Sequence, residues 1–182
     1  MAPTGVMGSP RAVARIAGAC YLLSVVAAVL GEAVLHGAPE YAAGNLAIAL
    51  FAVVTLGLFA LLRPVHAALA LLAALVNLGG LTLELLRLQP GGVNVALVLH
   101  GGYCLLVGAL AFRASFLPRA AGVLMAIAGF AWIVNLSPAL TARLAPGNVA
   151  LGFAGEGSFM LWLLVRAVDE TRWRARAAKA RG

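Results

Sequence analysis

Six apolar stretches, each long enough to cross a lipid bilayer, constrain the fold of this chain more than any other feature. A hydrocarbon core about 30 Å thick needs about 20 residues of helix, because a helix rises about 1.5 Å per residue. On that scale the predicted spans cover residues 13–35, 44–62, 65–86, 93–112, 116–136 and 147–168. We therefore predict an all-α fold, a six-helix transmembrane bundle over residues 11–168.

The composition excludes a soluble domain. Of the 182 residues, 63% are hydrophobic and 10% charged, and the mean hydropathy is +1.01. A small soluble protein could not bury that much apolar surface. The connections are short, so we expect consecutive helices to be antiparallel neighbours. Residues 1–10 are small, polar and rich in Pro and Gly, and we interpret them as a disordered start that precedes the membrane domain.

The placement of basic residues predicts the orientation of the bundle. With six spans both termini lie on one side, and that side receives eleven of the thirteen Lys and Arg residues. The other side receives only Arg87 and Arg143. Basic residues favour the cytoplasmic side of a membrane. We therefore predict a multi-pass protein of the cytoplasmic membrane with both termini in the cytoplasm.

Residues 169–182 form a basic cytoplasmic tail, for which two interpretations stay open. The tail can bind anionic lipid headgroups as a surface helix, or its charges can simply anchor the last span. Nucleic acid is not an expected partner, because the net charge of +7 sits at the ends of apolar stretches. The residues predicted to meet headgroups are Arg172, Arg174, Arg176, Lys179 and Arg181.

Ionisable residues inside apolar spans are costly and usually mark a site. From the predicted directions of the spans, most of these residues fall in the outer half of the bilayer. This layering predicts one polar pocket that opens to the outer side, with Glu156 about as deep as His100. The candidate pocket residues are Glu32, Asn77, Glu84, His100, Asn135 and Glu156.

Each pocket residue also has a purely structural interpretation. Glu32 and Glu84 lie near the interface and can reach water, and Arg87 can pair with Glu84 at a spacing of three residues. His100 can be a hydrogen-bonded packing residue. Small residues allow helices to approach closely, and we expect such packing to bring the fourth and sixth spans together. The glycines concerned are Gly101, Gly102, Gly152, Gly155 and Gly157.

The sequence predicts neither a cofactor nor a metal site. Cys20 and Cys104 lie inside apolar stretches and do not form a CxxC pair, so we interpret both as small buried hydrophobes. The candidate carboxylates and the histidine would suit a cation, but they lie on different spans without Glu-x-x-His or His-x-x-x-His spacing. A Gly-rich phosphate loop and a nucleophile elbow are absent from the sequence.

Four stretches together resemble a known family. They are RIAGACYLLSVVAAVLGE at 15–32, LLRPVHAALALLAAL at 61–75, FRASFLPRAAGVLMAIAG at 112–129 and GEGSFMLWLLVRAV at 155–168. In order and content they resemble a bacterial family of small polytopic membrane proteins catalogued as domain of unknown function number four-three-eight-six. The resemblance implies an integral membrane location and supplies no reaction.

Three functions remain open at this level. The favoured one is proton-linked binding or transport of a small molecule or lipophile in the outer pocket. The second is an intramembrane enzyme that uses Glu156 and His100 as acid and base on a lipid-like substrate. The third is a structural or partner-binding bundle whose polar residues tie helices together. A continuous cavity that reaches the glutamates favours the first two.

Overall fold

The computed structural model describes residues 9–180 and is built from helices throughout that range. Residues 1–8 of the predicted disordered start, and Arg181 of the basic tail, lie outside the described residues. Six helices are long and apolar enough to cross a membrane, which confirms the predicted all-α six-helix bundle. They are α1 (Pro10–Ala33), α2 (Ala38–Leu62), α3 (Ala67–Leu85), α4 (Val95–Arg113), α5 (Arg119–Ile133) and α7 (Gly147–Val165).

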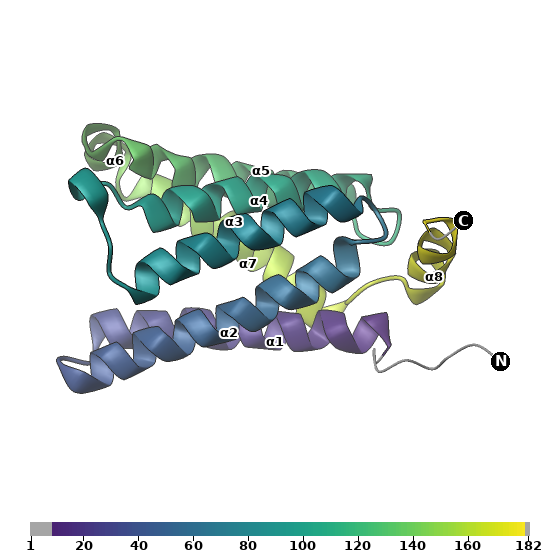
Figure 1. The fold of residues 1–182 in the computed structure, drawn as a ribbon, viewed down its shortest axis with the longest axis horizontal. Helices are drawn as coiled ribbons and strands as arrows, with labels where there is room; N and C mark the ends of the chain where they lie inside the picture. The colour runs from purple at the N-terminus through teal and green to yellow at the C-terminus, as the bar shows by residue number, and fades with distance from the viewer. Residues whose placement is uncertain (1–8, 181–182) are drawn as a thin grey trace.

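The six long helices form a closed ring (Figure 1). Each packs against the helices before and after it, and α7 closes the ring by packing against α1. Consecutive spans run in opposite directions, as short connections require. The polar side chains that point inward from all six helices can therefore meet on the axis of one bundle.

Local sequence sets the helix ends. Ser9 caps α1, where its side chain accepts a hydrogen bond from the backbone N–H of Ala12, and Asn94 caps α4 in the same way. α2 begins at Ala38, six residues before the predicted start at residue 44. Gly37, at φ +73°, makes the turn into this helix, and such a φ favours glycine.

A short helix lies between the fifth and sixth predicted spans. α6 (Pro138–Leu144) follows a 3₁₀ turn at Val134–Leu136 and covers part of the connection between α5 and α7. Ser137 caps α6, and Pro138 occupies its first turn. The sixth apolar stretch then begins as a helix at Gly147. α6 therefore lies at the end of the bundle where α1 and α3 finish (Figure 1).

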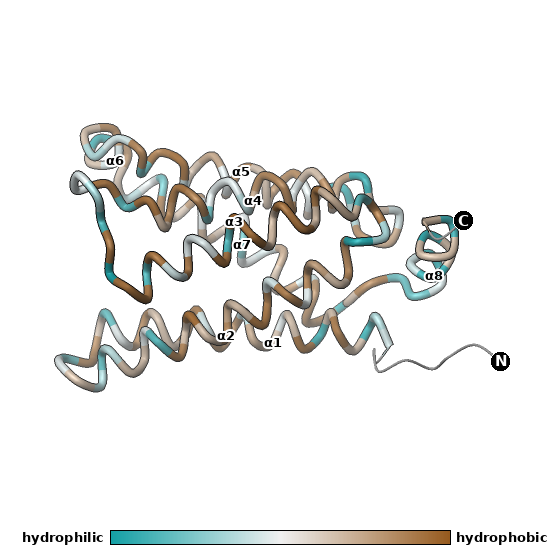
Figure 2. The backbone as a smooth tube through the Cα atoms, in the orientation of Figure 1, coloured by the Kyte–Doolittle hydropathy of each residue, from teal (hydrophilic) through white to brown (hydrophobic). Residues whose placement is uncertain are grey.

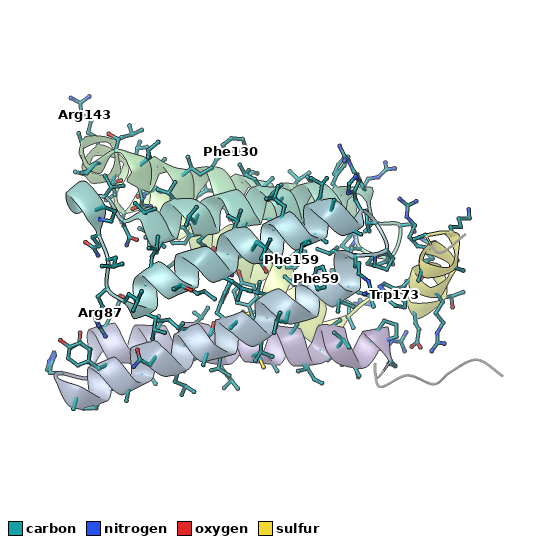
Figure 3. The ribbon with its side chains drawn as sticks, in the orientation of Figure 1. Phe59, Arg87, Phe130, Arg143, Phe159 and Trp173 are labelled. Carbon is teal, nitrogen blue, oxygen red and sulfur yellow. The ribbon has the colours of Figure 1, made fainter. Side chains whose placement is uncertain are left out.

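The outer surface of the bundle is apolar, and the largest fully buried side chains of its interior include Tyr21, Tyr103 and Phe159. Leu23, Leu56 and Phe130 are exposed, although each is strongly hydrophobic. Figure 2 shows hydrophobic residues along the long helices that face the viewer, and in Figure 3 Phe130 points away from the bundle whereas Phe159 lies within it. A surface with its hydrophobic side chains outward suits contact with lipid tails. Together with the six apolar helices, it indicates a multi-pass membrane protein.

The basic tail folds as α8 (Glu170–Lys179) and docks on the end of the bundle where α1 begins (Figure 1). The indole Nε1–H of Trp173 donates to the carbonyl of Leu61 over 2.9 Å. Arg172 donates to the carbonyl of Ser115 over 3.2 Å. These contacts use helix-end and loop carbonyls, groups that otherwise lack an intrahelical partner. α8 therefore closes one end of the bundle, a role that neither interpretation of the tail included.

Glycines bring α4 and α5 into close contact. A Cβ atom added at Gly101 would lie 2.7 Å from the carbonyl oxygen of Gly129. At Gly108 the added atom would lie 2.7 Å from the carbonyl oxygen of Gly122. Only glycine permits this approach at Gly101 and Gly108. Gly102 makes ordinary contact, because its nearest neighbour, a methyl carbon of Val76, would be 3.8 Å away.

The glycines of α7 also face α5, so the expectation that glycine packing joins the fourth and sixth spans is wrong. Gly152 meets the ring of Trp132, and Gly155 meets Ala128. Gly157 meets no atom within 4 Å among the described residues. α5 thus packs against both α4 and α7. The side chains of those two helices meet across the interior of the ring.

Candidate functional site

Glu156 is a buried carboxylate whose two oxygen atoms are both hydrogen-bonded inside the bundle. The hydroxyl of Tyr21 donates to Oε2, and the indole N–H of Trp132 donates to Oε1. The Nε2 atom of His100 lies 3.1 Å from Oε1. A buried carboxylate is tolerated only with such partners. Helices α1, α4 and α5 supply them.

The hydrogen-bonded chain continues from His100 to α2. The Nδ1 atom of His100 lies 3.1 Å from Oδ1 of Asn77. The Asn77 amide donates to Oγ1 of Thr55 over 2.7 Å, and that hydroxyl donates to the carbonyl of Phe51 over 2.9 Å. The network therefore contains one side chain from each of the six long helices. They are Tyr21, Thr55, Asn77, His100, Trp132 and Glu156.

The order of donors fixes the tautomer of His100. The Asn77 amide nitrogen is committed to Thr55, so its oxygen faces His100 and must accept a proton from Nδ1. One further proton then lies between Nε2 of His100 and Oε1 of Glu156. The pair is either an imidazolium with a carboxylate or a neutral imidazole with a carboxylic acid. In both forms its net charge is zero, which suits a membrane interior.

A cavity of about 200 Å³ begins at this network and is lined by all six long helices. Glu32, Glu84 and the His100–Glu156 pair supply the ionisable groups of its wall. Aliphatic side chains supply much of the rest, together with aromatic ones such as Phe51 and Phe153. Among the described residues that line it, none is Lys or Arg. The cavity is therefore mostly apolar with a few convergent polar groups, as small-molecule sites usually are.

A second cavity of about 150 Å³ adjoins the first near the end of the bundle opposite α8. Both cavities are lined by Glu32 and Glu84, which lie in the last turns of α1 and α3 and are exposed. Arg87 lines the second cavity, and its guanidinium lies 4.1 Å from the centre of the Tyr41 ring. No ion pair joins Arg87 to Glu84 in the described part of the chain.

Five of the six predicted pocket residues line the first cavity, namely Glu32, Asn77, Glu84, His100 and Glu156. Asn135 does not line it: its side chain donates to the backbone carbonyl of Trp132 over 2.9 Å. Glu156 is the tenth of the 19 residues of α7, about 14 Å from the start of that helix. The network thus lies near the middle of α7.

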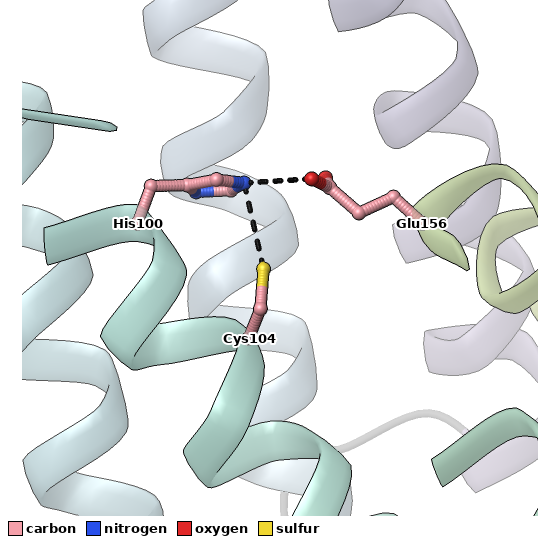
Figure 4. Close-up of side chains that lie close together, drawn as sticks. All are labelled: His100, Cys104 and Glu156. Atoms are coloured by element: carbon pink, nitrogen blue, oxygen red, sulfur yellow. Dashed lines mark hydrogen bonds and ion pairs between the residues drawn. The ribbon is translucent and has the colours of Figure 1, made fainter. Parts of the chain in front are cut away.

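The sequence prediction missed four side chains of this site. Tyr21, Thr55 and Trp132 are residue types that occur commonly in apolar helices, so nothing in the sequence distinguishes them. Cys104 had a usable signal, because it follows His100 by four residues and so lies on the same helix face. Its Sγ atom is 3.6 Å from Nε2 of His100, and Figure 4 shows both side chains beside Glu156.

Part of the chain matches a known family model. Residues 79–167 match DUF4386, a domain of unknown function. The matched segment runs from the second half of α3 to the end of α7, so it contains His100, Cys104 and Glu156. The resemblance predicted from the sequence is confirmed over these residues. The stretches at 15–32 and 61–75 lie outside the match. Neither a curated protein nor a solved structure matches the chain.

Proposed function

We propose that this protein binds a small molecule with an apolar body in the cavity between its six long helices. The observation that carries the proposal is the lining of that cavity: Glu32, Glu84 and the His100–Glu156 pair share one apolar-walled space of about 200 Å³. An open space beside these residues favours ligand binding over a role in joining helices alone. The coupling of binding to a proton, favoured from the sequence, stays a prediction.

The proposed ligand enters from the outer side of the cytoplasmic membrane. Support comes from the adjoining cavity at the end opposite α8, where Glu32 and Glu84 are exposed. The bias of Lys and Arg toward the other end favours a cytoplasmic position for both termini. Binding and release on the outer side need no path through the rest of the bundle.

A structural role is the second candidate, and one observation favours it. Both oxygen atoms of Glu156 have partners inside the protein, from Tyr21, Trp132 and His100. Such a network would also be accounted for if its sole role were to hold the six helices together. Glu32 and Glu84 distinguish the two candidates, because neither is hydrogen-bonded within this network.

We also propose that α8 contacts anionic lipid headgroups. Arg172 and Arg176 donate to backbone carbonyls of the bundle. Both are exposed, as is Lys179. A basic juxtamembrane helix attracts anionic lipid. Native mass spectra should show retention of anionic over zwitterionic phospholipid, and this preference should fall in a Lys179→Gln variant. Equal retention of both lipids by the wild-type protein would exclude this contact.

The test of the cavity is mass spectrometry of molecules that co-purify with the protein in mild detergent. Ala28→Trp places a large ring in the wall of both cavities. Leu30→Trp is the matched control, because Leu30 is 47% exposed on the same helix and does not line the cavity. We expect a small molecule bound to the wild-type protein and the control, and lost from Ala28→Trp. Identical spectra for all three would favour the structural role.

A further inference from the structure

We propose that His100, Cys104 and Glu156 bind a divalent transition-metal ion of the zinc type at the floor of the cavity. This site goes beyond the proposed ligand binding and does not depend on it. Nε2 of His100, Sγ of Cys104 and a carboxylate oxygen of Glu156 lie within 4.8 Å of one another. All three side chains converge on one point in Figure 4.

The distances between the donor atoms suit such an ion. Zinc binds sulfur at about 2.3 Å and nitrogen or oxygen at about 2.0–2.2 Å. With tetrahedral angles these lengths separate the nitrogen from the sulfur by about 3.6 Å and from the oxygen by about 3.4 Å. The observed separations from Nε2 are 3.6 Å to Cys104 Sγ and 3.1 Å to Glu156 Oε1. These two separations need a change of only a few tenths of an ångström, whereas the sulfur and the carboxylate oxygen, which lie within 4.8 Å of each other, would have to approach to about 3.6 Å to hold the ion.

The surrounding side chains already hold the ligands in binding orientation. Asn77 accepts the proton of His100 Nδ1, so the lone pair of the neutral imidazole at Nε2 is available to the ion. Tyr21 and Trp132 donate to Glu156 and hold its carboxylate. Hydrogen bonds of this kind to a histidine and a carboxylate are the usual support of a bound metal.

The charges of the site balance with a divalent ion. A thiolate, a carboxylate and a neutral imidazole carry two negative charges, so the loaded site is neutral. On binding, the thiol proton and the proton between His100 and Glu156 leave through the cavity to solvent. Two positive charges enter and two leave, so no net charge is buried in the bundle.

The donor set also indicates which ion binds. A sulfur, a nitrogen and an oxygen atom suit zinc and its neighbours, whereas Mg²⁺ and Ca²⁺ prefer oxygen alone. Three protein ligands leave a fourth position. His100 and Glu156 line the cavity, so that position faces the space where a small molecule would bind. Zinc sites that act on a bound molecule have the same open position.

The test begins with the full-length protein, expressed with zinc in the medium. Its metal content is measured by inductively coupled plasma mass spectrometry. We expect about one zinc ion per chain in the wild-type protein. Cys104→Ala should retain less than about one tenth of that amount. Cys20→Ala is the matched control, since Cys20 is a cysteine of α1 outside the cluster, and it should retain zinc as the wild type does.

Cobalt then serves as a spectroscopic probe of the stripped protein. Co²⁺ bound by a thiolate gives a near-ultraviolet charge-transfer band that needs no knowledge of the cavity ligand. The band should appear in the wild type and in Cys20→Ala and be absent from Cys104→Ala. Asn77→Leu keeps all three ligands but removes the support of His100, and should weaken Co²⁺ binding about 10- to 100-fold.

Two results would overturn the proposal. One is a wild-type protein that binds no zinc and shows no thiolate band with Co²⁺. The other is a Cys104→Ala variant that binds both ions as the wild type does. Circular dichroism of each variant shows whether it is folded, so that lost binding is not confused with unfolding. Retention of the co-purifying small molecule is measured separately and tests the cavity alone.

Discussion

The Nε2 atom of His100 on α4 lies 3.1 Å from the carboxylate of Glu156 on α7. These two helices are not neighbours in the ring, because α5 packs between them. The pair thus spans the interior of the ring instead of an interface between neighbouring helices. Through Asn77 and Thr55 on one side, and Tyr21 and Trp132 on the other, it connects all six long helices. A change at Glu156 should therefore affect the whole bundle.

Replacement of Glu156 by Gln should destabilise the protein. The amide nitrogen cannot accept a hydrogen bond, so either Tyr21 or Trp132 loses its acceptor. A buried donor without a partner costs about 1–3 kcal/mol, which lowers Tm by about 5 °C. Thermal unfolding with a chelator present measures the change without a contribution from metal.

Glu32→Gln is the control for this prediction. Glu32 is exposed near the end of α1, and substitutions at such positions shift Tm by less than about 2 °C. Equal shifts in the two variants would show that the Glu156 network contributes nothing to stability.

Two adjacent glycines of α4 should respond in opposite ways to alanine. At Gly101 the new methyl group would lie 2.7 Å from the carbonyl oxygen of Gly129, and such overpacking costs about 1–3 kcal/mol. At Gly102 the nearest atom would be 3.8 Å away, so the better helix propensity of alanine should raise stability by up to about 1 kcal/mol. Tm values of both variants in one detergent test the packing of α4 on α5, which would be wrong if Gly101→Ala were the more stable.

Removal of the Trp173 side chain should release α8 from the bundle. A ten-residue helix is marginal by itself in water, and Trp173 donates to the carbonyl of Leu61. Hydrogen–deuterium exchange of α8 amides should be about tenfold faster in Trp173→Ala. Arg174→Gln removes only an exposed pair with Glu170 and should change exchange less than about twofold. Unchanged exchange in Trp173→Ala would mean that other contacts dock α8.

The topology that we predict from charge can be tested with reporter proteins. Alkaline phosphatase is active only outside the cytoplasm, so it should be active when inserted after Arg143 and inactive when fused to the C-terminus. Green fluorescent protein at the C-terminus should be fluorescent. The reverse pattern would invert the bundle and place the opening of the cavity in the cytoplasm.

The six long helices could be predicted because length and hydropathy alone mark a membrane span. Their ends could not, since caps and turn residues act locally: Gly37 and the first turn of α2 extend that helix into an apparent loop. The docking of α8 on the bundle escaped prediction for another reason. Its charges look like simple anchoring, and only the three-dimensional arrangement brings Trp173 to the carbonyl of Leu61.

The candidate site also has residues that the sequence could predict and residues that it could not. Glu32, Glu84 and Glu156 could be predicted because a carboxylate in an apolar stretch is unusual. Tyr21 and Trp132 could not, because their importance depends on the rotation of α1 and α5 toward Glu156. Depth along each helix was also insufficient to place Asn135. Its side chain donates to the backbone carbonyl of Trp132 and does not line the cavity.

A crystal structure of the gently purified protein in a lipid phase tests the central claim most directly. The account predicts electron density for a bound small molecule in the cavity lined by Glu32, Glu84 and the His100–Glu156 pair, absent from crystals of Ala28→Trp. A wild-type cavity that holds only ordered water, or that is closed by contact between α1 and α3, would contradict it.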